Sequence, residues 1–321
     1  LAQARRLARD AGVWTVVLGE YTTAGDSVML VARAYDVRSG DRLDLAQAEG
    51  PSTDDVRPLF DELAAKLLNL SGMPATGRTT LSAVTTGSLE AYRHYLAGVE
   101  HLNGWDLPAA ERELGAAVAL DSTFSLAYFK LALTRGWRVG ADDSVGQRAI
   151  ALAARYGQRL PQREQERIEA YRAMTDHDFE RSRTAYARLV AADSADADAW
   201  YGLGDAWFHS PEYASRAQAM THALRAFRRA LALDPNYHLA YDHVSFLLTQ
   251  AAAADPAYAL LDGEAFVPTR DKQGRAQLSA AALTTARDRA RGAAVTAARD
   301  WVAAQPALLR AHRALLEAHL A

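Results

Sequence analysis

One stretch in the second half of the chain limits the fold more than any other. It contains two sets of residues at fixed spacing: Trp200, Leu203, Gly204 and Trp207, then Ala223, Phe227, Ala230 and Pro235. Small residues at helical spacing let two helices cross closely, and aromatic residues fill the space beside them. The proline ends the second helix because it cannot continue the hydrogen-bond ladder. The stretch therefore predicts a pair of antiparallel helices, which must stack on similar pairs to bury its apolar face.

The spacing resembles the tetratricopeptide repeat (TPR), a helical hairpin of about 34 residues that opens with W-x2-L-G-x2-Y. Weaker copies in the same phase include Gly98, Tyr128, Ala170 and Tyr241. The resemblance implies a mainly α fold, an α-α superhelix of TPR-type hairpins over residues 87–321. Insertions are expected at about 209–220 and 251–277. In the second insertion, residues 265–278 read equally as a small hairpin about Asp271–Gly274 or as a loop.

The first 72 residues show a different periodicity. Helices are predicted at 1–11 and about 56–70, and strands at 13–21, 27–37 and 42–48, with Gly-Asp and Ser-Gly-Asp turns between them. In the second strand, Met29, Val31, Tyr35 and Val37 share one face. We expect a small α+β domain with an antiparallel sheet over 1–72. Residues 73–86, rich in Thr, Gly, Ser and Pro, are expected to be a linker.

The order of helix, "VWTVVLGEY", Gly-Asp turn, "VMLVARAYDVRSGDRL" and helix resembles the TolB amino-terminal-like (FlgO-like) module. That module lies outside the membrane in some bacterial receptor kinases, cyclases and membrane-anchored regulators. The family usually begins with a further strand and helix, which are missing before Leu1. We therefore expect a partial module within a longer protein. The resemblance implies an extracytoplasmic location, periplasmic or at the cell surface, with the cytoplasm as the alternative.

Composition excludes some kinds of site. The chain has 321 residues, a formal net charge of -3 and no Cys. Without Cys there is no disulfide, thiolate nucleophile or Cys-based metal site. A basic stripe typical of nucleic-acid binding is missing, so no nucleic-acid partner is expected. No apolar run approaches the ~20 residues of a membrane span, so membrane attachment would come through segments outside this sequence.

The sequence carries no recognisable catalytic motif. There is no Gly-rich phosphate loop, H-E-x-x-H or G-x-S-x-G pattern. The tightest histidine cluster is His238, Asp242 and His243, but a metal site needs three or four convergent ligands, and surface polarity explains the cluster better. We therefore predict no catalytic residue, no cofactor and no metal. Asp178 is expected to cap a helix.

The TPR resemblance also implies a binding surface, because the first helix of each repeat lines the inner face of such arrays. The residues placed there are Tyr95, Phe129, Arg167, Tyr171, Tyr201, Asp205, Asp242 and Phe246. This set lacks the Lys/Asn/Arg constellation that clamps a C-terminal carboxylate, so an apolar or basic peptide is expected. The alternative, that these side chains pack inside the array, stays open. Trp200, Trp207, Tyr186 and Phe227 are expected in the repeat core.

The leading functional hypothesis is a non-catalytic protein-interaction or sensor module in a larger bacterial signalling protein, such as a Ser/Thr receptor kinase. It would bind a protein or peptide partner in a concave groove. Two alternatives remain: a regulatory arm of a transcription regulator, and an enzyme using the His238/Asp242/His243 cluster. The sequence does not indicate an oligomeric state.

Overall fold

The computed structural model describes residues 1–10, 15–52, 55–67, 86–140, 142–210, 216–261 and 265–321. These residues divide into two compact units, which are described separately. The first contains residues 1–100 and 107–165, and the second contains residues 101–106 and 166–321. The predicted linker at 73–86 lies outside the described residues except for Thr86. Among the described residues, no helix is both long and apolar enough to cross a lipid bilayer.

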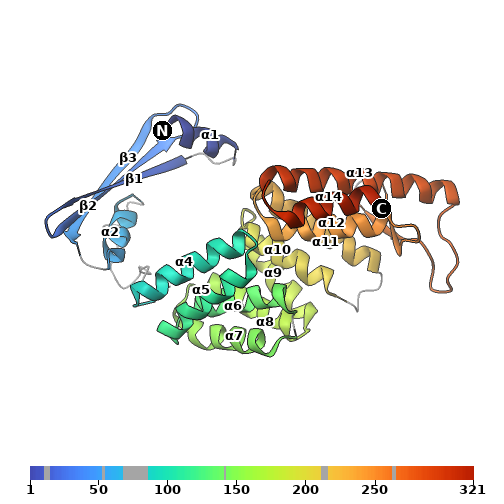
Figure 1. Cartoon of the computed structure of the whole chain (residues 1–321), viewed down its shortest axis with the longest axis horizontal. Helices are drawn as coiled ribbons and strands as arrows, with labels where there is room; N and C mark the ends of the chain where they lie inside the picture. The colour runs from blue at the N-terminus through green and yellow to red at the C-terminus, as the bar shows by residue number, and fades with distance from the viewer. Residues whose placement is uncertain (11–14, 53–54, 68–85, 141, 211–215, 262–264) are drawn as a thin grey trace. The chain divides into compact units, whose positions relative to one another are not determined.

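The first unit begins with the predicted antiparallel sheet. Its strands β1 (Thr15–Ala24), β2 (Ser27–Asp36) and β3 (Arg42–Pro51) pair in the order β1-β2-β3, shown in blue in Figure 1. Gly25 and Gly40, in the two turns, have φ angles of 58° and 86°. Glycine accepts this left-handed conformation without steric cost. The helices α1 (Ala2–Asp10) and α2 (Arg57–Leu67) flank the sheet in sequence.

The core of this sheet lies on the face of β2 opposite to Met29. Val28, Leu30 and Ala32 are buried in one cluster with Leu63 of α2, whereas Met29 is 36% exposed. Side chains alternate between faces along a strand, so the helix packs on the alternate set. It packs mainly on β3 and β2, and Tyr21 of β1 stays 76% exposed.

Helical hairpins follow the sheet. The first unit continues with α4 (Leu89–Asn103), α5 (Leu107–Leu120), α6 (Ser125–Arg138), α7 (Ser144–Tyr156) and the short η2 (Gly157–Arg159). The later helices are α8 (Gln162–Thr175), α9 (Phe179–Ala192), α10 (Ala197–Phe208), α11 (Arg216–Leu233), α12 (His238–Ala252), α13 (Ala280–Ala304) and α14 (Leu309–Leu320). Consecutive helices pack on each other, as α10 does on α11 and α12 on α13. The mainly α fold with a small antiparallel sheet is confirmed.

Small residues of the repeat motif lie where these helices approach most closely. A Cβ built on Gly204 of α10 would lie 2.7 Å from Cδ1 of Phe227 on α11, and Gly202 faces Tyr186 of α9 at still closer range. Phe227 and Tyr186 are buried, as predicted, but Trp200 and Trp207 are only half-buried. Trp207 stacks on His222 with 4.4 Å between ring centroids, and the guanidinium of Arg183 lies 4.7 Å over its ring.

Aspartates begin several of these helices. Asp178 accepts a hydrogen bond from the backbone N–H of Arg181 at the start of α9, as predicted. Asp143 does the same for Gly146 at the start of α7. Such caps satisfy backbone donors that the helix itself leaves open.

The insertion at 251–277 contains a small sheet. Tyr258–Leu260 (β4) pairs antiparallel with Phe266–Pro268 (β5), and one further bridge joins Arg270 to Ala276 around the predicted turn. Tyr258 and Phe266 are buried against each other, with ring centroids 4.8 Å apart. The predicted hairpin about Asp271–Gly274 is therefore present only as this single bridge, and the two-stranded sheet pairs Phe266–Pro268 with an earlier segment instead. The other predicted insertion, at 209–220, lies partly outside the described residues.

Candidate functional site

The predicted groove residues divide between the two units. Tyr95 and Phe129 belong to the first unit, and the others belong to the second. Phe129, Tyr171 and Tyr201 are buried, with 4–7% of each residue exposed. Tyr95 packs against Phe124, with 5.0 Å between ring centroids. Phe129, Tyr171 and Tyr201 therefore pack inside their units, whereas Tyr95 is half-buried.

The predicted Arg167 takes part in an ionic network. Its Nη2 donates to Oδ2 of Asp196 at 2.6 Å, and its Nη1 lies 3.7 Å from Asp198. Tyr237 donates from its hydroxyl to Asp198 at 2.6 Å. Asp196 also caps α10. The network therefore connects α8 to the start of α10 and to the loop before α12.

The predicted Asp205 lies inside this part of the array, with 13% of its side chain exposed. Burial alone would raise the pKa of its carboxyl group, but hydrogen bonds and charge from His209 and His243 lower that pKa well below its usual range. Burial and the charge of Asp205 together raise the pKa of the Tyr171 hydroxyl. Asp205 thus places a carboxyl group beside two histidines in the interior of the second unit.

The histidine cluster considered from the sequence does not assemble. Asp242 pairs with Arg310 instead, while His243 turns toward Asp205. In place of His238 and Asp242, the structure brings Asp205 and His209 to His243 as the group that could hold a metal ion. The separation of Asp205 and His209 by one helical turn was the available sequence signal for this group.

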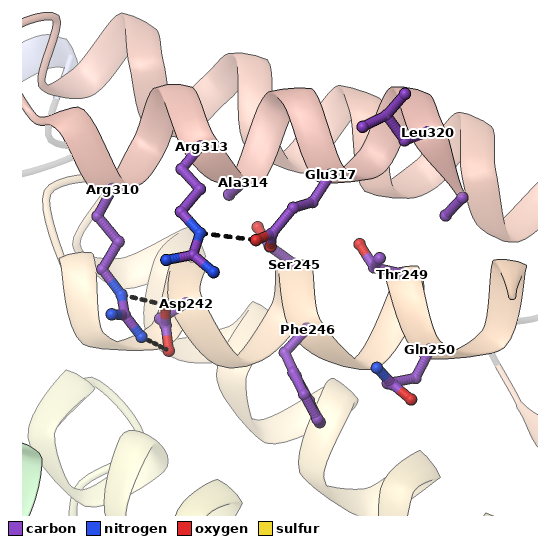
Figure 2. Close-up of a pocket in the computed structure, with 11 residues that line it drawn as sticks. Asp242, Ser245, Phe246, Thr249, Gln250, Arg310, Arg313, Ala314, Glu317 and Leu320 are labelled. Carbon is purple, nitrogen blue, oxygen red and sulfur yellow. Dashed lines mark hydrogen bonds and ion pairs between the residues drawn. The ribbon is translucent and has the colours of Figure 1, made fainter.

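Two of the predicted residues, Asp242 and Phe246, line a pocket between α12 and α14, here called the α12/α14 pocket. Its volume is about 610 Å³. Figure 2 shows side chains of α14 pointing toward α12 across it. The lining consists of Asp242, Ser245, Phe246, Thr249 and Gln250 from α12, and of Arg310, Arg313, Ala314, Glu317, Leu320 and Ala321 from the C-terminal segment.

Charge in this pocket is balanced by ion pairs within its lining. Arg310 pairs with Asp242, and the hydrogen bonds that Arg310 donates to this carboxylate raise the pKa of the arginine. Arg313 pairs with Glu317 at 2.7 Å. The apolar lining side chains stay accessible, since Phe246 is 48% and Leu320 78% exposed. The pocket residues of α14 were not predicted from the sequence.

Comparison with known proteins gives a likeness of fold. No protein-family model matches the chain, and no curated protein matches it. Similar solved structures include YrrB, described as a TPR protein with an unusual peptide-binding site. YrrB is 14% identical with a TM-score of 0.32, and the match covers 72% of this chain and 92% of YrrB.

Two further structures are similar. MamA is 14% identical with a TM-score of 0.31, and the match covers 68% of this chain and 98% of MamA. The APC/C assembly Cut9–Hcn1 is 19% identical with a TM-score of 0.34, covering 71% of this chain and 43% of that one. These TM-scores are low, so the assignment of the fold comes from the hairpins and motif spacing described above.

Proposed function

We propose that this chain is a non-catalytic protein-interaction module that binds a short peptide segment of a partner in the α12/α14 pocket. The observation that carries this proposal is the exposure of Phe246 and Leu320, at 48% and 78%, within one pocket. Exposed apolar side chains in a concave site are typical of binding sites, where they receive apolar groups of the ligand.

The polar lining supports a peptide as the ligand. Thr249 and Gln250 offer a hydroxyl and an amide that can pair with peptide N–H and C=O groups. Asp242 and Glu317 are each neutralised by an arginine of the same lining. The pocket therefore favours an uncharged apolar segment over the basic one that the sequence also allowed.

A peptide-display selection on the full chain tests this function. We expect enriched peptides with apolar residues whose affinity falls at least several-fold in Phe246→Ala and Leu320→Ala. Leu309→Ala is the matched control, because Leu309 is 81% exposed on α14 but does not line the pocket. Peptides that bind all three variants as tightly as the unaltered chain would place binding elsewhere, and a selection without enrichment would contradict the function.

We also propose that this module belongs to a larger bacterial signalling protein and lies outside the cytoplasm. The support is the likeness of residues 1–72 to the TolB amino-terminal-like module, in which strands and turns follow the same order. The coding sequence upstream of Leu1 tests it. A kinase domain followed by a membrane span agrees with this proposal, whereas a winged-helix segment would indicate the regulatory arm of a transcription regulator.

A further inference from the structure

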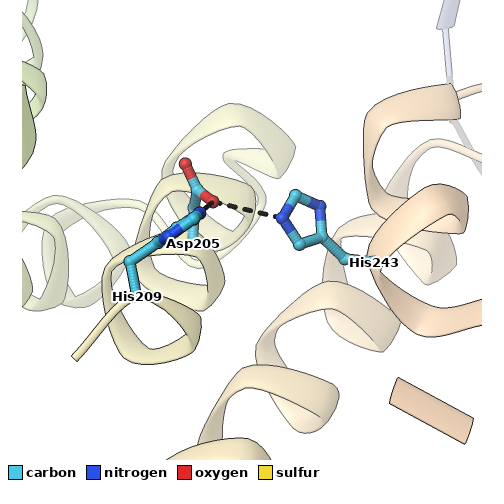
Figure 3. Close-up of side chains that lie close together, drawn as sticks. All are labelled: Asp205, His209 and His243. Atoms are coloured by element: carbon cyan, nitrogen blue, oxygen red, sulfur yellow. Dashed lines mark ion pairs between the residues drawn. The ribbon is translucent and has the colours of Figure 1, made fainter. Parts of the chain in front are cut away.

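Three side chains from two helices meet around one carboxylate oxygen (Figure 3). Asp205 lies on α10, His209 follows one turn later as the C-cap of that helix, and His243 comes from α12. Nε2 of His209 lies 3.4 Å from Oδ1 of Asp205, and Nε2 of His243 lies 3.3 Å from the same oxygen. The three candidate ligand atoms all lie within 4.8 Å of one another.

These separations are long for hydrogen bonds between charged groups, which are about 2.7–2.9 Å. The two contacts to Asp205 match two edges of a metal coordination tetrahedron. Zinc binds imidazole nitrogen at about 2.0–2.1 Å and carboxylate oxygen at about 2.0–2.2 Å, which places neighbouring ligand atoms about 3.3–3.5 Å apart. Both contacts to Asp205, at 3.3 and 3.4 Å, fit that distance.

The orientation of His243 supports the same interpretation. Its Nδ1 lies 3.2 Å from the backbone carbonyl oxygen of Leu239. A carbonyl oxygen only accepts hydrogen bonds, so Nδ1 carries a proton and donates it to Leu239, and Nε2 is the ring nitrogen that faces Asp205. Metal-bound histidines commonly donate their other N–H to a carbonyl or carboxylate in this way.

The surroundings of the cluster give an ion access but also oppose its charge. The side chains of Asp205 and His243 are 13% and 7% exposed, whereas that of His209 is 47% exposed, so solvent reaches the cluster at His209. The aromatic ring of Phe208 packs against His243, with 4.7 Å between centroids. The positive charge of Arg216 acts on His209 and opposes a cation. We therefore expect weaker affinity than at a site with two carboxylates.

We propose that Asp205, His209 and His243 bind one divalent transition-metal ion, with Zn²⁺ as the best fit to two imidazoles and one carboxylate in a tetrahedron. The fourth position is left for water or another ligand. The ion joins α10 to α12, the first helices of two successive hairpins. Its role is to hold these hairpins together, and it is independent of peptide binding in the α12/α14 pocket.

Calorimetric titration of the metal-free full chain with ZnCl2 at neutral pH tests this site. We expect one ion per chain and a rise in thermal midpoint with zinc, because a ligand that binds only the folded state stabilises it. His209→Gln should weaken zinc binding by more than about 10-fold, since even outer-shell substitutions cost that much. His312→Gln, at an exposed helical histidine outside the cluster, should leave it unchanged.

Two further measurements complete the test. Co²⁺ in place of zinc should give the intense visible absorption of a tetrahedral site, and Asp205→Asn, checked by circular dichroism, should abolish that spectrum. The proposal is overturned if zinc does not bind stoichiometrically, or if His209→Gln and His312→Gln reduce binding equally. A folded chain that takes up no metal would show that a protonated histidine, not an ion, faces Asp205.

Discussion

Arg310 of α14 donates two parallel hydrogen bonds to Asp242 of α12, from Nε to Oδ1 at 2.6 Å and from Nη2 to Oδ2 at 3.0 Å. The planar guanidinium matches the carboxylate in this bidentate arrangement. The guanidinium of Arg310 also lies over the ring of Trp105, with 4.8 Å from its carbon to the ring centroid. The pair fixes the spacing of the two helices that form the α12/α14 pocket.

Replacing Arg310 should therefore weaken both the array and the pocket. We expect Arg310→Ala to lower the free energy of unfolding by about 1 kcal/mol, near the upper end for exposed ion pairs. Arg310→Lys should recover little, because lysine cannot form the bidentate pair. Urea denaturation measures both. Arg313→Ala, which breaks a pair within α14, should cost less than about 0.5 kcal/mol, and an equal loss in the two alanine variants would count against the inter-helix role.

Replacing a buried tryptophan should cost more stability than replacing a half-buried one. Trp301 is completely buried, so Trp301→Ala should cost about 3–5 kcal/mol. Trp207, which the sequence placed in the core, is only half-buried between Arg183 and His222. Its alanine variant should lose clearly less stability. Thermal or urea unfolding of the two variants side by side checks this order, and a larger loss for Trp207→Ala would show that the Arg183–Trp207–His222 stack matters more than burial.

A methyl group should be harmful at one helical glycine and harmless at another. At Gly204 it would meet Phe227 at 2.7 Å, whereas at Gly292 it would meet nothing within 4 Å. Overpacking of this kind typically costs about 1–3 kcal/mol. Gly292→Ala should instead stabilise α13 by up to about 1 kcal/mol, the difference in helix propensity. Midpoints of chemical denaturation that fall for Gly204→Ala and rise for Gly292→Ala are the expected result.

Asp143 should make the first unit sensitive to acid. Hydrogen bonds from Arg135 outweigh the effect of burial and, with the cap on Gly146, lower the pKa of Asp143. A carboxyl group with a lowered folded-state pKa adds stability above its unfolded value of about 3.9, and this stability is lost as pH falls through the folded-state pKa.

Asp143→Asn keeps a capping oxygen but removes the charge. At neutral pH we expect it to cost about 2 kcal/mol, the range for hydrogen bonds to charged groups. The gap to the unaltered chain should shrink as pH is lowered past 4. Denaturation curves at a series of pH values measure the gap, and a difference that stays constant down to strongly acidic pH would rule out this electrostatic origin.

The sequence predicted the positions of helices and strands better than it predicted which of their faces are buried. Alternation and the turns at Gly25 and Gly40 were enough to predict three antiparallel strands. The face of β2 that is covered depends on where α2 packs, and Val28 and Met29 are both apolar, so the pattern could not choose between them. Likewise, the TPR resemblance placed Tyr171 and Tyr201 on the inner face but left open whether they pack inside the array, and neighbouring helices do bury them.

The histidine cluster shows the same limit. His238 and Asp242 are near His243 in sequence, but neither joins its cluster, and Asp242 pairs with Arg310 instead. Asp205 and His209 reach His243 only because α10 and α12 pack in a particular rotation and register, which depends on close contacts such as Gly204 with Phe227. Local spacing identified one of the three residues, and tertiary packing supplied the other two.

The second unit is not continuous in sequence, since residues 101–106 belong to it while residues 107–165 do not. Trp105 in this short segment contacts Trp301, with 5.9 Å between ring centroids, and receives the guanidinium of Arg310. A fragment that starts at Glu166 would therefore lack Trp105, which packs against the buried side chain of Trp301. A fragment that keeps this unit whole must therefore include residues 101–106.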